Sequence, residues 1–199
     1  MKKKQLTFKE FKKSVLNDYQ IVCQSREASL LGRKEVLTGK AKFGIFGDGK
    51  EVAQVAMART FHHGDFRSGY YRDQTFMLAI GELTIEALFA QLYSNTDIQQ
   101  EPASAGRQMN NHFATRSLDK NGQWKNIKQQ YNSASDISPT AAQMPRLLGL
   151  GHASKIYRDN KQLKNTKFSD FGNEIAYGTI GNASTSEGLF FETINAAGV

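Results

Sequence analysis

The sequence contains one cysteine, three prolines and no long hydrophobic run. The single cysteine, Cys23, excludes an internal disulfide and fits a reducing, cytoplasmic setting, and its place in an apolar helical pattern predicts a small core residue. The basic first residues are not followed by an apolar stretch, so we expect no secretory signal. No segment approaches the run of about 20 apolar residues that crosses a membrane, so we expect no membrane partner.

A chain of 199 residues, of which 39% are hydrophobic, can form one domain with a core and does not have the composition of a disordered protein. Its net charge of +7 allows an anionic partner. The basic residues gather near the start and between residues 155 and 167, as is typical of solvated surfaces, without the interleaved aromatic residues of a nucleic-acid-binding surface. We therefore expect no nucleic-acid partner.

The chain opens with a long predicted helix. Thr7 and Glu10 form a capping-box pattern and apolar residues follow at helical spacing, which predicts an amphipathic helix from about residue 8 to residue 37, ending near Gly39. Residues 1–40 would form an amino-terminal helical segment, packed outside the main domain or at a subunit interface. Residues 41–199 would form the main domain.

Apolar spacing and turn residues predict the remaining elements. These are a glycine-rich connector at 43–49, a short helix after it, a turn at 63–65, a short strand at 66–71, a helix at 84–93, a helix opened by Ser138 and Pro139, a basic loop at 158–171, a buried strand at 174–180 and a helix from about 186. The last helix would include Val199 and lacks a following strand, so we expect the chain to stop within its fold. The order of elements predicts an α/β fold, a parallel sheet flanked by helices with the ligand at the carboxyl ends of the strands.

Two stretches have the chemistry to bind phosphate. Residues 181–183 join the last strand to the last helix through small residues, and such a turn exposes backbone amides to a phosphate group, although many α/β folds turn tightly here without a ligand. Tyr71 and Arg72 follow the first strand, and arginine offers a planar fork to phosphate oxygens. On spacing alone, a surface ion pair between Arg72 and Asp73 is the more common arrangement.

The polar stretch at 95–136 is too long for an ordinary connection and is typical of a functional, ligand-ordered or flexible loop. It contains His112, which could act as a general acid or base near neutral pH. A single histidine in a loop is more often only solvated. The residue types alone leave both interpretations open.

The order of four blocks carries a resemblance to a known family. The blocks are residues 49–55 with Gly64-Asp65 and Tyr71-Arg72-Asp73; Gly106-Arg107-Gln108-Met109 with His112; Ser138-Pro139 with Gln143 and Pro145; and Gly181-Asn182-Ala183-Ser184 with Ser186-Glu187-Gly188. Together they resemble the amino-terminal part of the alpha, thiamin-diphosphate-binding portion of 2-oxo acid dehydrogenases, nearest to the branched-chain members, over roughly residues 20–199. Residues 47–49 match the opening of the thiamin diphosphate motif better than 181–183 do, but they lack a preceding strand and a nearby closing asparagine pair, so we reject them.

The resemblance implies roles for the residues that match. Tyr71 and Arg72 would hold the diphosphate of thiamin diphosphate. Ser138, together with Thr140, would line the cofactor. His112 would face the reacting group and assist acyl transfer to a lipoyl group.

The same resemblance assigns the last turn to the metal. Asn182 would bind magnesium, and the amides of Ala183 and Ser184 would meet the diphosphate. The family has a carboxylate at the position of Asn182, so a negative charge is missing beside the metal. A potassium site of the family is not expected, because Ile137 and Ala142 replace residues with side-chain oxygens.

The implied activity is oxidative decarboxylation of a branched-chain 2-oxo acid, with acyl transfer to the lipoyl group of a partner acyltransferase. The implied assembly is an oligomer with a beta subunit or a fused beta half, which would carry a glutamate that activates the cofactor, so we expect no turnover from this chain alone. Two alternatives remain: a relative that acts on pyruvate or acetoin, and a noncatalytic assembly paralogue. Asn182 favours the paralogue, whereas Tyr71, Arg72 and His112 oppose it.

Overall fold

The computed structural model describes residues 6–163 and 166–199. Some basic residues of the two clusters noted in the sequence fall at 1–5 and 164–165 and therefore lie outside the described part. The elements are α1 (Phe8–Leu37), α2 (Glu51–Ala58), β1 (Phe66–Ser68), α3 (Gln74–Ala79), α4 (Ile85–Leu92), the 3-10 turn η1 (Ile127–Gln129), β2 (Asn132–Ser133), α5 (Gln143–Asp159), η2 (Lys161–Leu163), β3 (Ala176–Gly178), η3 (Ala183–Ser186) and α6 (Gly188–Ala197).

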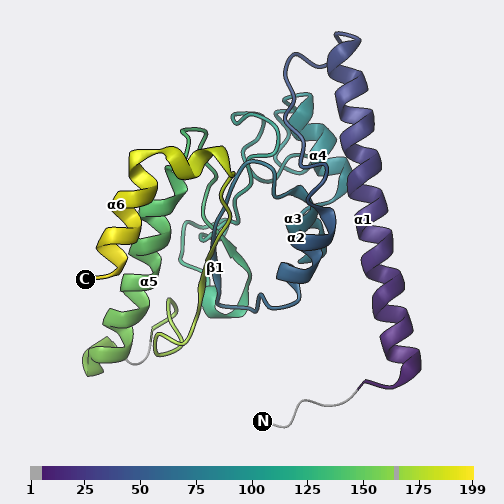
Figure 1. The fold of residues 1–199 in the computed structure, drawn as a ribbon. Coiled ribbons are helices and arrows are strands. Elements are labelled where there is room, and N and C mark those ends of the chain that lie inside the picture. The colour runs from purple at the N-terminus through teal and green to yellow at the C-terminus, as the bar shows by residue number, and fades with distance from the viewer. Residues whose placement is uncertain (1–5, 164–165) are drawn as a thin grey trace.

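Three short strands form a parallel sheet in the order β2-β1-β3. Phe66 at the start of β1 pairs with Asn132 on one side and with Ala176 on the other. Figure 1 shows α5 and α6 on one side of the sheet and α1 to α4 on the other. The α/β fold class is therefore confirmed, with helices flanking a parallel sheet.

Two predictions about the strands need correction. The sequence did not predict β2, because its residues are polar and are held by hydrogen bonds rather than by apolar alternation. The strand at 174–180 was predicted to be buried, but in β3 Ala176 and Tyr177 are half-buried and Gly178 is exposed. In the described part of the chain β3 is an edge strand that pairs only with β1, which leaves one side open.

Helix α1 has the predicted bounds and the predicted capping box. The Thr7 backbone N–H donates to Glu10 Oε2 at 2.8 Å, and the Glu10 N–H donates to Thr7 Oγ1 at 3.3 Å. The helix packs against α2, α3 and α4 through its second half, where the buried residues are Ser25, Ala28, Ser29, Gly32 and Glu35. The amino-terminal end of the helix projects beyond the rest of the chain, as Figure 1 shows. Phe8, in its first turn, is 79% exposed. Within the described part of the chain, most of the predicted apolar face is therefore exposed: Phe8, Phe11, Val15 and Tyr19.

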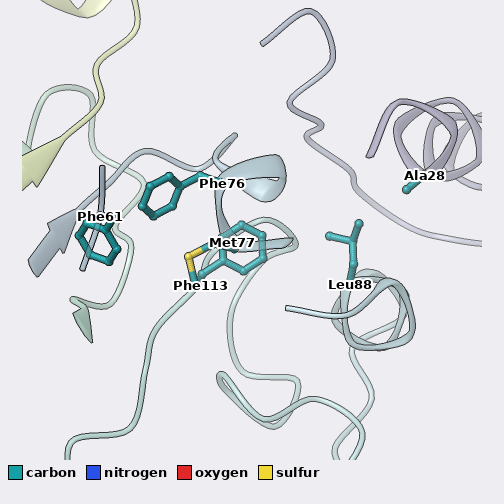
Figure 2. Packing of buried hydrophobic residues seen from close by; sticks show 6 residues of the cluster. All are labelled: Ala28, Phe61, Phe76, Met77, Leu88 and Phe113. Atoms are coloured by element: carbon teal, nitrogen blue, oxygen red, sulfur yellow. The ribbon is translucent and has the colours of Figure 1, made fainter. Parts of the chain in front are cut away.

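The main core lies between α1 and the sheet. Figure 2 shows its buried members, which are Ala28, Phe61, Phe76, Met77, Leu88 and Phe113. Phe61 meets Phe76 edge-on with ring centroids 5.1 Å apart, an arrangement that aromatic pairs favour. Cys23 lies outside this cluster and is only partly buried, so the prediction of a core cysteine is wrong.

Two helix boundaries differ from the predictions, and one helix was not predicted. The helix expected to open at Ser138 and Pro139 begins at Gln143, because Ala141 has a φ of +62° and this left-handed conformation cannot continue a helix. Helix α6 ends at Ala197, so Val199 lies outside it. Helix α3 was not predicted, because its six residues are too few to show helical periodicity.

Candidate active site

The parallel strands bring the predicted site residues to one edge of the sheet. Tyr71 and Arg72 follow β1, Ser138 follows β2, and Asn182 follows β3. All three strands run in the same direction, so these residues leave the sheet at its carboxyl edge, where α/β folds bind ligands. Segments that are far apart in the sequence therefore meet because of the strand order.

His112 is held between Tyr71 and Ser138. The imidazole is 3% exposed and stacks on the Tyr71 ring, with centroids 5.8 Å apart and planes 10° apart. Its Nδ1 lies 3.1 Å from the Asn110 carbonyl oxygen and its Nε2 lies 2.8 Å from Ser138 Oγ. A carbonyl oxygen only accepts, so Nδ1 carries the proton, and in the neutral ring Nε2 accepts from the Ser138 hydroxyl. A merely solvated loop histidine is excluded by this burial.

A buried ion cluster lies behind these residues. Arg67, in the middle of β1, is 1% exposed and donates from Nη2 to Asp73 Oδ2 at 2.8 Å and to Asp136 Oδ2 at 3.0 Å. Its Nη1 donates to Ser133 Oγ on β2 at 2.7 Å. Burial opposes the charge on Arg67, but the carboxylates of Asp136 and Asp73 outweigh it and raise the pKa of the guanidinium. Burial also raises the pKa of Asp136, although Arg67 works against this.

The ion cluster fixes the backbone on both sides of the stacked pair. Asp73 Oδ2 accepts from the backbone N–H of Tyr70 at 3.1 Å, and Arg67 Nη2 donates to the Tyr70 carbonyl at 3.1 Å. Asp136 Oδ2 accepts from the backbone N–H of Phe113 at 3.0 Å. Because Tyr70 adjoins Tyr71 and Phe113 adjoins His112, the cluster positions both rings of the stack. No sequence pattern predicted this positioning role.

Arg72 has a different environment from the one that its spacing predicts. Asp73 forms its ion pair with Arg67. The prediction of a surface ion pair between Arg72 and Asp73 is therefore wrong. No ion pair of Arg72 is present among the described residues, and its Nε is buried without a hydrogen-bond partner there. The guanidinium lies against the Tyr70 and Tyr71 rings, 5.9 and 6.0 Å from their centroids. Arg72 is therefore a cation whose buried N–H donor has no partner among the described residues, which suits it to bind an anionic ligand.

Arg72 also lines a cavity of about 310 Å³, together with Arg33 and Phe46. Asp48, on the wall of the same cavity, accepts from Arg33 at 2.7 Å. Asp48 thus forms an ion pair with Arg33 of α1. The cavity provides space beside the positive charge of Arg72.

The turn after β3 contributes exposed residues to the site. Asn182 is exposed and its side chain makes no capping hydrogen bond. The Ser184 amide donates to the Gly181 carbonyl at 3.0 Å. The turn lies against Tyr70, because a Cβ atom added at Gly181 would be 3.3 Å from the Tyr70 hydroxyl. Thr140 is exposed too. In the described part of the chain no group of three His, Cys, Asp or Glu residues could hold a metal ion, and the Asn182 side chain offers a metal one amide oxygen.

Comparison with known proteins decides the family. Residues 26–199 match the family described as "Dehydrogenase E1 component". The chain belongs to this family. A curated relative, "2-oxoisovalerate dehydrogenase subunit alpha, mitochondrial" of Caenorhabditis elegans, is 28% identical over 132 residues, which cover 66% of this chain and 26% of the relative. The match thus spans about a quarter of that relative's length.

The sequence resemblance to the alpha part of 2-oxo acid dehydrogenases, the decarboxylating first component, is therefore confirmed. None of the helices in the described part of this dehydrogenase E1 chain is long and apolar enough to span a membrane.

Proposed function

We propose that this chain provides the alpha-side cofactor site of a thiamin-diphosphate-dependent 2-oxo acid dehydrogenase, of the branched-chain type. The observation that carries the proposal is Arg72, whose buried Nε has no partner among the described residues at the carboxyl edge of the sheet. Arg72 would bind the diphosphate through charge-assisted hydrogen bonds, with the Tyr71 hydroxyl beside it. The family match and the curated relative support the same reading.

When bound, thiamin diphosphate supplies the electron sink for removing carbon dioxide from a 2-oxo acid. Ser138 and Thr140 would line the cofactor, and the side chains of both residues are exposed. His112 would donate or accept a proton at Nε2, while its Nδ1–H stays fixed on the Asn110 carbonyl. The partners would be a beta subunit or fused beta half and a lipoyl-bearing acyltransferase.

The magnesium half of the cofactor proposal lies at the turn after β3. Asn182 would offer its side-chain oxygen, and the Ala183 amide would meet the diphosphate. The Ser184 amide would first have to leave its bond to the Gly181 carbonyl. A neutral ligand binds magnesium more weakly than a carboxylate, so affinity should be low.

The test compares thiamin diphosphate binding by the wild type and by Arg72→Met, using the complete gene product with any beta partner and calorimetry in the presence of magnesium. We expect at least about a tenfold loss of affinity, because a charge-assisted bond is worth about 1.5–3 kcal/mol. Arg59→Met, a change at an exposed arginine that pairs with Asp18 on α1, is the matched control. Equal affinity in Arg72→Met would contradict the proposed diphosphate site.

The second candidate is a noncatalytic assembly paralogue, and the exposed, neutral Asn182 is the observation that favours it. Decarboxylation of branched-chain 2-oxo acids and of pyruvate by the same complete assembly separates the candidates. Cofactor-dependent turnover would support the enzyme and name its substrate class. A folded assembly that binds no thiamin diphosphate and turns over neither substrate would favour the paralogue.

A further inference from the structure

A cavity of about 220 Å³ lies on the other side of the His112 segment from Tyr71 and Ser138, and the proposed cofactor site does not use it. It is lined by α4, by residues 101–103 and by the chain that follows His112. Its volume is below the roughly 300–1,000 Å³ of pockets for drug-sized ligands, so it suits a smaller molecule.

A buried side chain in this cavity has an unused acceptor. Gln91, on α4, is 2% exposed and lines the cavity. Its Nε2 donates to the His112 carbonyl at 2.6 Å, whereas its Oε1 is buried without a partner among the described residues. An unpaired buried carbonyl oxygen costs free energy, so a ligand that brings an N–H or O–H donor would be favoured here.

The rest of the lining defines the other parts of the ligand. Met77, Leu83 and Phe113 contribute apolar surface. Arg116 and Lys125 place two cations at the cavity, and no ion pair of either is present among the described residues. These cations suit a carboxylate, and the apolar wall suits a short hydrocarbon group.

Glu82 adds a second acceptor to the cavity. Partial burial raises the pKa of its carboxyl group, although Lys125 and His63 act in the opposite direction. The residue as a whole is exposed, and a positively charged ligand group would pair with its carboxylate. Acceptors for an ammonium group, cations for a carboxylate and an apolar wall therefore occur in one small cavity.

We propose that this cavity binds an apolar α-amino acid, with the ammonium group at Gln91 Oε1 and Glu82, the carboxylate at Arg116 and Lys125, and the side chain against Met77, Leu83 and Phe113. The site is separate from the cofactor edge, because the His112 backbone lies between them: its carbonyl meets Gln91, and its imidazole meets Ser138.

The experiment is calorimetric titration of the full chain with three related probes, without thiamin diphosphate, so that its outcome does not depend on the proposed function. L-Valine carries both charged groups, 3-methylbutanoate lacks the ammonium group and 2-methylpropylamine lacks the carboxylate. We expect L-valine to bind, and each truncated probe to bind at least about tenfold more weakly, because each loses charge-assisted hydrogen bonds. No binding of L-valine, or equal binding of 3-methylbutanoate, would overturn the proposal.

Two variants locate the binding. Ala87→Leu fills the cavity from α4 and should abolish L-valine binding, whereas Ala56→Leu, at an exposed position on α2, should leave it unchanged. Arg116→Gln keeps the surface polar and should weaken L-valine at least about tenfold while affecting 2-methylpropylamine little. Circular dichroism checks that each variant is folded. Wild-type affinity in both Ala87→Leu and Arg116→Gln would place any binding elsewhere and contradict the assignment.

Discussion

The two halves of the candidate site are built differently. The half after β1 and β2 contains Tyr71, His112 and Ser138, and buried ion pairs and hydrogen bonds hold it from behind. The half after β3 contains Asn182, which is exposed and makes no capping bond. The chain itself thus fixes the geometry of the first half. The second half has little side-chain support, so a bound ligand would contribute most to its order.

The largest effect should follow from removing the cation of the ion cluster. Arg67→Met leaves Asp73 and Asp136 buried without their common partner, so we expect a loss of about 3–5 kcal/mol in the free energy of unfolding, measured by urea denaturation. Arg59→Met is the matched control, because Arg59 pairs with Asp18 at the surface and should cost less than about 1 kcal/mol. Equal losses in the two variants would show that the cluster does not hold the first half together.

A smaller and pH-dependent effect should follow from Asp136. Its pKa in the folded chain lies above the ordinary 3.8, so the folded state binds this proton more tightly than the unfolded state does. The corresponding stability is present below the ordinary pKa and is lost as the pH rises through the raised pKa. We therefore expect the wild type to lose stability relative to Asp136→Asn as the pH rises from about 4 to about 8.

Urea denaturation across that pH range measures the difference. Glu192→Gln, an exposed change on α6, serves as the control and should give a difference that varies much less with pH. Parallel stability curves for the wild type and Asp136→Asn would mean that the buried carboxyl titrates as it does in the unfolded chain. The balance of charges behind His112 would then have to be reconsidered.

The sequence predicted the helices better than it predicted the contacts behind the site. Helix α1 was predicted with its observed bounds because a capping box and long apolar periodicity mark it locally. The strand order brought Tyr71, Ser138 and Asn182 to one edge as expected of an α/β fold. The partnership of Arg67 with Asp136 could not be predicted, because it joins residues 69 positions apart and depends on the pairing of β1 with the unpredicted β2.

The apolar face of α1 shows a second limit of sequence patterns. Phe8 and Phe11 lie at helical spacing, yet both are exposed, and the helix packs through small side chains further along. At Gly32 the reason is steric, because a side chain there would collide with the Phe46 ring. Periodicity therefore predicted the helix but not the face that this chain buries.

The smallest effect on stability should come from Asn182, and this prediction tests the exposed half of the site. Asn182→Asp should change the free energy of unfolding by no more than about 0.5 kcal/mol, because the side chain is exposed and makes no capping bond. The same change should strengthen magnesium binding in the presence of thiamin diphosphate, because a carboxylate is a better ligand than an amide. Thermal unfolding and calorimetry measure the two effects, and Asn195→Asp on α6 is the matched control. Unchanged magnesium affinity in Asn182→Asp would mean that residue 182 is not a metal ligand, and the support for the β3 half of the site would then rest on its backbone amides alone.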